Sequence, residues 1–156
     1  MELTAQDIAR FFPKRDKNAH KGSFGKLLLL CGSRGFTGAP YFAAMGALRV
    51  GAGLVYLGVP ESIYGIEAVK LNEPVIFPLP ESGGQLSAEA VPEILERLPR
   101  MDALLIGPGL GLNSSCFRVL QAVLTHAACP VVVDADGITL LSGHKDLLRG
   151  REAPTV

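Results

Sequence analysis

The sequence predicts a doubly wound α/β fold with a mostly parallel sheet, because short apolar runs alternate with longer segments of helical spacing. Three of these runs, Leu27–Leu30, Ala103–Ile106 and Val131–Val133, run into glycine or aspartate. Hydrophobic residues make up 48% of the 156 residues, and charged residues only 19%. This apolar composition is typical of parallel strands that are covered on both faces, and the length indicates one domain.

In the first half of the chain, capping residues and helix breakers mark the expected boundaries. Thr4 or Asp7 can cap a first helix, and Pro13 would stop it. Glycines at 51 and 53 accept the left-handed backbone that ends a helix. In chain order we expect a helix over Ala5–Phe12, a loop over Asp16–Ser23, a strand over Lys26–Cys31, a helix over Gly38–Val50 and a strand over Leu54–Val59.

In the second half, Pro74 and Pro78 flank a short apolar run, and Glu89 and Glu93 lie near the positive end of a predicted helix. The expected elements are a helix over Ser62–Val69, a strand over Val75–Phe77, a turn over Pro80–Gln85, a helix over Ser87–Leu98, a strand over Ala103–Ile106, a helix over Ser114–His126, a strand over Pro130–Val133, a short helix over Ile138–Leu141 and mostly loop over Gly143–Val156. Within that last stretch, Arg151–Val156 is typical of the approach to another buried strand. We therefore expect residues 1–156 to be the N-terminal portion of one larger domain.

The charge balance argues against a nucleic-acid or membrane partner. Fifteen basic residues offset fifteen acidic ones, so there is no broad cationic field. No apolar stretch approaches the roughly 20 residues that span a bilayer, and Met1–Lys17 lacks the apolar centre of a signal peptide. The thiols of Cys31, Cys116 and Cys129 are expected to be reduced and buried, as in a cytoplasmic protein.

Two glycine-rich loops point to a phosphate-bearing ligand. In an open parallel sheet, ligands bind beyond the carboxyl ends of the strands, where backbone N–H groups favour anions. The first loop, Gly32–Gly38, has the spacing GxxGxxG and so supports a dinucleotide site of the GxGxxG type only weakly. A tight turn explains it equally well. The second loop, Gly107–Gly111, is the sharper signal, because it leaves bare, rigid backbone after a strand.

The charged residues near these loops could each have more than one role. Asp134 and Asp136 follow a predicted strand and could hold Mg²⁺, orient a hydroxyl or raise each other's pKa. For Asp136, capping the next helix is the simpler role. Lys21 is expected near the same crevice, where it would neutralise phosphate, and a solvated lysine is the alternative. No histidine pair or Cys/His cluster has the spacing of metal ligands, and Ser114-Ser115 has no nearby base that would make it a nucleophile.

Five blocks together resemble the NAD(P)H-hydrate dehydratases, which belong to the ribokinase-like superfamily. The blocks are His20–Lys26, Gly32-Ser33 with Phe36–Pro40, Ala47–Val55, Gly107–Gly111 and Asp134–Gly137. Their order and spacing make the match far more specific than any single glycine loop. The resemblance implies a ribokinase-like three-layer α/β/α sandwich.

The resemblance also implies a repair reaction. Such enzymes use ADP or ATP, with Mg²⁺, to phosphorylate the hydroxyl of (6S)-NADH or NADPH hydrate; phosphate then leaves and NAD(P)H is restored. Ala39, Gly107, Gly109 and Gly111 would contact the hydrated dinucleotide, and Asp134 lies in the last block without a catalytic duty. Relatives often form homo-oligomers, and some are fused to or work with an epimerase domain.

The chain departs from the family pattern at its end. The family's late glycine-rich anion hole, with the aspartate that acts as base, is absent from these 156 residues. We therefore expect no catalytic residue here and no turnover by this segment alone. Two alternatives stay open: a ribokinase-like kinase for a vitamin-precursor alcohol, and a nucleotide-binding module without catalysis.

Overall fold

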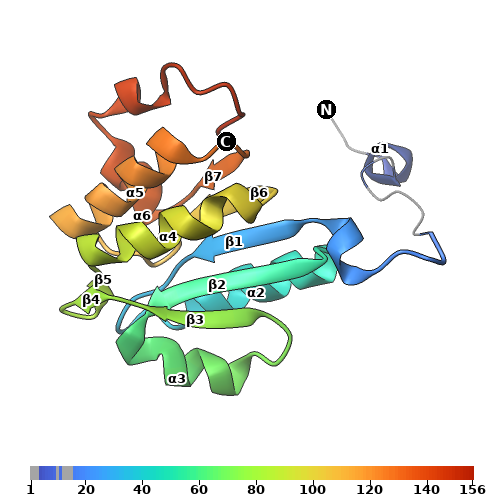
Figure 1. Cartoon of the computed structure of the whole chain (residues 1–156), viewed down its shortest axis with the longest axis horizontal. Coiled ribbons are helices and arrows are strands. Elements are labelled where there is room, and N and C mark those ends of the chain that lie inside the picture. Colours follow the sequence, from blue (N-terminus) through green and yellow to red (C-terminus); the bar gives the residue numbers. More distant parts are fainter. Residues whose placement is uncertain (1–3, 10, 12–15) are drawn as a thin grey trace.

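The computed structural model describes residues 4–9, 11 and 16–156 (Figure 1). Helix α1 spans Ala5–Ala9. The predicted end of this helix at Phe12 and its stop at Pro13 lie outside the described residues. Within the described part, no helix has the length and hydropathy needed to cross a membrane.

The central sheet has five strands in the order β3-β2-β1-β6-β7. Their bounds are Lys26–Leu30 for β1, Leu54–Pro60 for β2, Val75–Leu79 for β3, Ala103–Ile106 for β6 and Val131–Val133 for β7. Every pairing between neighbours is parallel. The chain builds outward from β1 on one side and then returns to β6 on the other. The loops after β1 and β6 therefore meet at a topological switch point, where doubly wound folds bind ligands.

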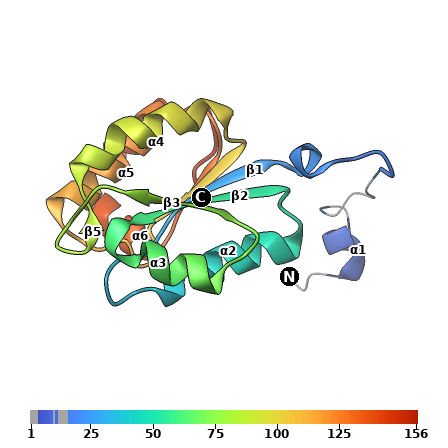
Figure 2. The same ribbon diagram turned by 60° about the horizontal axis from the view of Figure 1, so that its bottom comes forward.

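Helices cover both faces of the sheet, which gives the predicted three layers (Figure 2). One face carries α2 (Gly38–Val50) and α3 (Glu61–Lys70). The other carries α4 (Val91–Arg97) and α5 (Ser114–His126), and α5 contacts the short α6 (Asp136–Leu141).

Strand β1 shows why both faces are apolar. Leu28 and Leu30 pack into the core beneath α4 and α5, whereas Leu29 and Cys31 pack into the core beneath α2. All four side chains are fully buried. Successive residues of a strand point to opposite faces, so a strand in the middle layer needs a continuous apolar run.

The predicted elements are largely confirmed, with α2, β6 and α5 beginning and ending as expected. Strand β3 continues past its predicted end and includes Pro78, because β3 is the edge strand and an edge tolerates a residue without an N–H group. Helix α6 begins at Asp136, two residues before the predicted start.

Three predictions were wrong in detail. The loop expected over Asp16–Ser23 contains the start of a 3-10 helix, η1 (Lys21–Phe24). The turn expected over Pro80–Gln85 is a hairpin of β4 (Glu81–Ser82) and β5 (Gln85–Leu86). The single helix expected over Ser87–Leu98 is divided into η2 (Ala88–Ala90), α4 and η3 (Leu98–Arg100). Pro92 and Pro99 each lie near the start of one of these helices, where a missing N–H costs no helical hydrogen bond.

The end of the chain lies along strand β7. After the 3-10 helix η4 (Lys145–Leu148), Thr155 forms a parallel bridge with Val131, and the N–H of Val133 donates to the carbonyl of Val156 at 2.8 Å. This pairing confirms that Arg151–Val156 approaches the sheet as a strand would.

Candidate functional site

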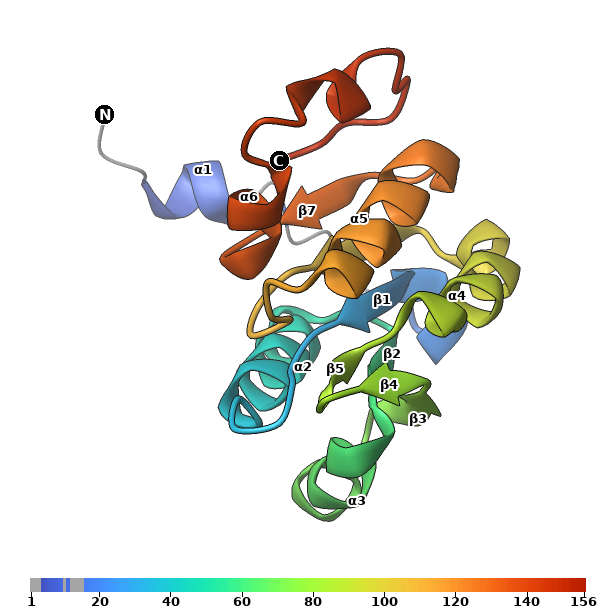
Figure 3. The ribbon, with the colours of Figure 1, turned by 90° about the vertical axis from the view of Figure 1, so that its left-hand side faces the viewer.

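The loops that follow β1 and β6 form one unit at the carboxyl edge of the sheet, which faces the viewer in Figure 3. The N–H of Gly32 donates to the carbonyl of Pro108 at 2.9 Å, and the Ser33 hydroxyl donates to the carbonyl of Gly109 at 2.7 Å. These two bonds fix loop 32–38 against loop 107–111. The two glycine loops that the sequence singled out are therefore neighbours in space.

Gly107 brings the loop after β7 into the same unit. A Cβ on Gly107 would lie 2.0 Å from the carbonyl oxygen of Asp134 and 2.8 Å from the nitrogen of Gly137. Its φ of +126° is also one that side-chain-bearing residues rarely adopt. Only glycine allows this close approach of two backbones, so the position of Asp134 beside the crevice depends on Gly107.

Gly109 meets the beginning of helix α2. A Cβ on Gly109, whose φ is +64°, would lie 3.0 Å from the Cβ atoms of both Ala39 and Phe36. Gly111 is linked to the same region, because its N–H donates to Asp136 Oδ2 at 2.9 Å. The structure thus brings together Ala39, Gly107, Gly109, Gly111 and Asp134, as the sequence predicts; their contact with a ligand stays a prediction.

The N-terminus of α2 is open to an anion. Thr37 precedes the helix, and its side chain makes no capping hydrogen bond. Among the described residues, the N–H groups of Gly38 and Gly109 have no hydrogen-bond acceptor. The unpaired donors and the dipole of a 13-residue helix make this corner of the crevice attractive to phosphate oxygens.

The two aspartates after β7 play different parts. Asp136 does not cap α6, as the sequence favoured; its carboxylate holds Gly111 instead. Asp134 is exposed. Between them, Ala135 has a φ of +51°, which places backbone strain at the rim of the crevice. Of these two aspartates, Asp136 is held by the backbone, whereas the carboxylate of Asp134 has no hydrogen-bond donor among the described residues.

Lys21 is not part of this crevice, so that expectation was wrong. A Cβ on Gly53, just before β2, would overlap the carbonyl oxygen of Lys21. Residues that precede parallel strands lie at the amino edge, and Figure 1 shows η1 at the end of β1 away from the arrowhead. The error arose because Lys21 comes before β1, whereas the glycine loop follows it.

Sequence reasoning missed an ion pair between a buried glutamate and a partly exposed lysine, which supports the crevice. Lys70 Nζ donates to the carbonyl of Thr37 at 2.9 Å and to Glu67 Oε1 at 3.2 Å. Glu67 is fully buried, and its second oxygen, Oε2, has no partner among the described residues. Burial raises the pKa of Glu67, and the nearby Lys70 ammonium opposes that rise. The available signal was an acidic residue four positions after the buried Ile63, on the core face of α3.

Sequence reasoning also missed the β4–β5 hairpin as part of the site. The N–H of Arg34 donates to the carbonyl of Gly84 at 2.7 Å, and the side chain of Gln85 lies against Gly111. Gly83 and Gly84 both have positive φ, at +63° and +82°, as a tight two-residue hairpin requires. The Gly-Gly pair was the signal for a hairpin, but nothing local predicts where the hairpin packs.

Two buried thiols near the crevice are not nucleophiles. Burial raises the pKa of Cys31, and Asp134 adds to the rise. Burial also raises the pKa of Cys116 to about 11. A thiol that stays protonated behaves as a small apolar group. Cys31 and Cys116 are free and buried as expected, whereas Cys129 is free but only partly buried.

The described residues contain no group of three His, Cys, Asp or Glu side chains that could hold a metal ion.

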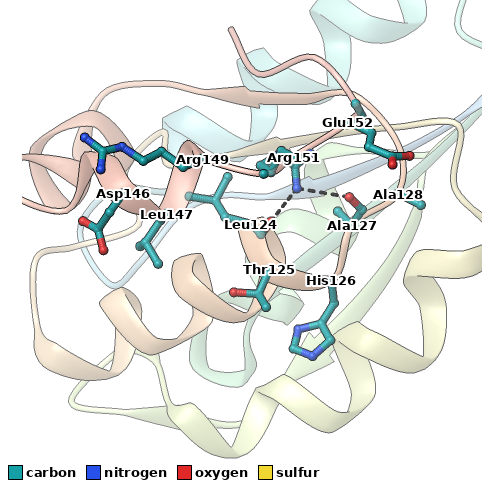
Figure 4. Close-up of a pocket in the computed structure, with 12 residues that line it drawn as sticks. Leu124, Thr125, His126, Ala127, Ala128, Asp146, Leu147, Arg149, Arg151 and Glu152 are labelled. Atoms are coloured by element: carbon teal, nitrogen blue, oxygen red, sulfur yellow. Dashed lines mark hydrogen bonds between the residues drawn. The ribbon is translucent and has the colours of Figure 1, made fainter.

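A cavity of about 470 Å³ lies away from the crevice, between the end of α5 and residues 146–153 (Figure 4). Its Arg151 donates to the carbonyls of Leu124 and Ala127, so this arginine caps α5.

Comparison with known proteins identifies the family to which this chain is similar. A family model described as NAD(P)H-hydrate dehydratase matches residues 27–156. The bifunctional NAD(P)H-hydrate repair enzyme of Moorella thermoacetica is 40% identical over 155 residues, which are 99% of this chain and 29% of that enzyme.

Solved structures confirm the ribokinase-like fold. The ADP/ATP-dependent NAD(P)H-hydrate dehydratase of Bacillus subtilis, co-crystallized with ATP and Mg²⁺, superposes with a TM-score of 0.69 and 30% identity over 86% of this chain and 45% of its own. A ribokinase-like superfamily protein of Enterococcus faecalis has a TM-score of 0.71 at 24% identity, covering 85% of this chain and 44% of its own. The chain therefore spans less than half the length of each of these relatives.

Proposed function

Because this chain belongs to the NAD(P)H-hydrate dehydratase family, we propose that it forms the dinucleotide-binding part of an enzyme that dehydrates (6S)-NADH or NADPH hydrate. The proposed reaction uses ADP or ATP to phosphorylate the hydroxyl of the hydrate. Loss of phosphate then restores NADH or NADPH.

The convergence of three strand-end loops carries this proposal. Gly109 lies against Ala39 at the start of α2, and Gly107 lies against Asp134 after β7. Backbone N–H groups at Gly38 and Gly109 have no acceptor in the described part of the chain. We assign these donors to the pyrophosphate of the substrate, because oriented amides bind phosphate oxygens without a counter-charge.

The residues of this chain would bind and orient the substrate. Ala39 and the glycines at 107, 109 and 111 allow the dinucleotide to lie directly against the backbone. Asp134 would accept a hydrogen bond from a substrate hydroxyl at the rim. Phosphorylation itself needs a base and a nucleotide site, and we assign both to the parts of the family domain that this chain does not align with.

We place Mg²⁺ on the nucleotide. The described residues provide no cluster of ligands for it, and Mg²⁺ commonly binds through phosphates with one or two carboxylates. No catalytic step in this chain is assigned to the metal.

The proposal is tested by incubating the full-length parent protein with hydrated NADH and either ADP or ATP. We expect NADH to be regained, measured by its dihydronicotinamide absorbance. Failure with both nucleotides would contradict the proposal, and stable accumulation of a phosphorylated alcohol would favour a small-molecule kinase. The 156-residue segment alone serves as the control, since we expect it to bind the dinucleotide without turning it over.

The partners and location that we propose follow the family. The bifunctional name of the Moorella relative supports an epimerase that acts with this dehydratase. We also propose a homo-oligomer, and a cytoplasmic location in which the three thiols stay reduced. Size-exclusion chromatography with light scattering on the full-length protein tests the oligomer, and a monomer would contradict it.

A further inference from the structure

We infer that Arg34 binds a phosphate group of the dinucleotide and that the β4–β5 hairpin holds Arg34 in position for this contact. The inference rests on the proposed function, because it assigns a part of that same crevice. Arg34 lies within the first glycine loop, but neither Arg34 nor the hairpin is among the site residues that the sequence indicated.

Arg34 is exposed on the loop that joins β1 to α2. Gly32 and Gly35, on either side, have φ values of +85° and +90°. The neighbouring Ser33 is bonded to the carbonyl of Gly109, so Arg34 projects from a loop that is fixed to the crevice. The uncapped N-terminus of α2 begins four residues later, and its partial positive charge favours the same ligands.

The hairpin fixes both the backbone and the stem of Arg34. The N–H of Arg34 donates to the carbonyl of Gly84, and a Cβ on Gly84 would lie 2.4 Å from the Cβ of Arg34. Gly84 is buried although it is at the tip of a hairpin, because the arginine stem covers it. A stem that is already immobilised loses little conformational entropy when the guanidinium binds a ligand.

The hairpin is itself anchored at its base. Glu81 Oε2 accepts from both the N–H and the hydroxyl of Ser62, at 2.9 and 2.6 Å. The N–H of Ser87 donates to the carbonyl of Pro80 at 2.9 Å. The hairpin therefore acts as a rigid support for Arg34 and not as a mobile flap.

The guanidinium of Arg34 is unpaired within the described residues. Two other arginines differ: Arg97 pairs with Glu93 at 2.7 Å, and Arg151 donates to three backbone carbonyls. An arginine that is held by its stem and has no counter-ion suits an incoming phosphate, which it can bind through two parallel hydrogen bonds.

Two phosphates of the substrate are candidates, and they can be told apart. The pyrophosphate occurs in both hydrated NADH and hydrated NADPH, whereas the 2′-phosphate occurs only in hydrated NADPH. A contact with the pyrophosphate affects both substrates equally. A contact with the 2′-phosphate affects hydrated NADPH alone.

The first experiment compares Arg34→Gln with the wild type in the full-length protein, using both substrates. Loss of a charge-assisted hydrogen bond should raise KM about tenfold for hydrated NADPH, or for both substrates, while kcat changes less than twofold. Arg34→Lys should recover part of the loss. The matched control is Arg149→Gln, an exposed arginine beside the remote cavity, which should leave both KM values unchanged. Unchanged KM values in Arg34→Gln would overturn the inference.

A binding measurement separates this inference from the proposed function. If the wild type turns over neither substrate, the proposed function fails, and calorimetric titration with NADPH then tests Arg34 directly. We expect Arg34→Gln to bind NADPH about tenfold more weakly than the wild type does. Equal affinity would overturn the assignment of Arg34.

The second experiment tests the support by the hairpin. In Gly84→Ala the new methyl group displaces the arginine stem, so KM should rise as it does in Arg34→Gln. Gly83→Ala is the matched control, because Gly83 also has positive φ but has no atom within 4 Å of its Cβ position. The double variant of Arg34→Gln and Gly84→Ala should have the same KM as Arg34→Gln alone, since both changes remove the same contact between Arg34 and the phosphate. Equal effects of Gly83→Ala and Gly84→Ala on KM would contradict the role of the hairpin.

Discussion

At the scale of single residues, the crevice depends on glycines, because a residue without a side chain lets two backbone segments touch. Gly107 lets the backbone after β6 touch the backbone at Asp134, and Gly109 lets the second glycine loop touch Ala39. A methyl group at either position would separate two loops that must meet. These glycines therefore have a packing role as well as the ligand-binding role that we propose.

Gly107→Ala should destabilise the protein strongly. The alanine meets a fixed backbone oxygen, and its φ of +126° is strained, so we expect a loss of about 3 kcal/mol in the free energy of unfolding. Gly143→Ala is the control, with φ of +84° and open space, and should cost about 1–2 kcal/mol. Urea denaturation measures both. Equal losses would show that close packing of Gly107 against Asp134 does not contribute to the free energy of unfolding.

Glu67 should make the stability depend on pH. Burial raises its pKa in the folded protein above the ordinary value of 4.5, so the folded state holds the proton more tightly than the unfolded chain does. Stability is therefore lost as pH rises above about 4.5. Comparison of unfolding free energies at pH 4 and pH 7 should show a larger fall for the wild type than for Glu67→Gln. A parallel fall in both proteins would contradict the assignment.

At the scale of elements, what could be predicted depends on whether the signal was local. The apolar run before Gly107 and the glycine that ends α2 at Gly51 are local signals, and β6, α5 and α2 have their predicted bounds. Where the β4–β5 hairpin packs and how Asp136 bonds to Gly111 are long-range contacts, which no local pattern contains. Lys21 was misplaced because the position of the whole element at the amino edge, not its residue type, decides where it lies.

The end of α5 depends on a distant arginine. Arg151 donates to the carbonyls of Leu124, Ala127 and Cys129, at and just beyond the end of the helix, and these carbonyls have no other donor among the residues that the structure describes. Arg151→Met should lower the free energy of unfolding by about 1–3 kcal/mol. Thermal unfolding measures the loss, and Arg149→Met is the control, expected to be near neutral. A neutral Arg151→Met would contradict the capping role.

At the scale of the whole molecule, the order of the strands places the site. Because the chain turns back from β3 to β6, the loops after β1 and β6 are adjacent, and β7 adds the aspartates beside them. Periodicity predicted that these loops share one edge, and the structure confirms it. Parallel topology thus turns three separate sequence signals into a single surface.

The central claim is that this surface holds the dinucleotide. Amide hydrogen exchange in the full-length protein, with and without hydrated NADH, tests it most directly. We predict protection at Gly35, Gly38 and Gly109, with no change around Lys21 or around the cavity beside Arg151. Protection confined to either of those remote regions, with exchange at the three glycines unaltered, would contradict the account.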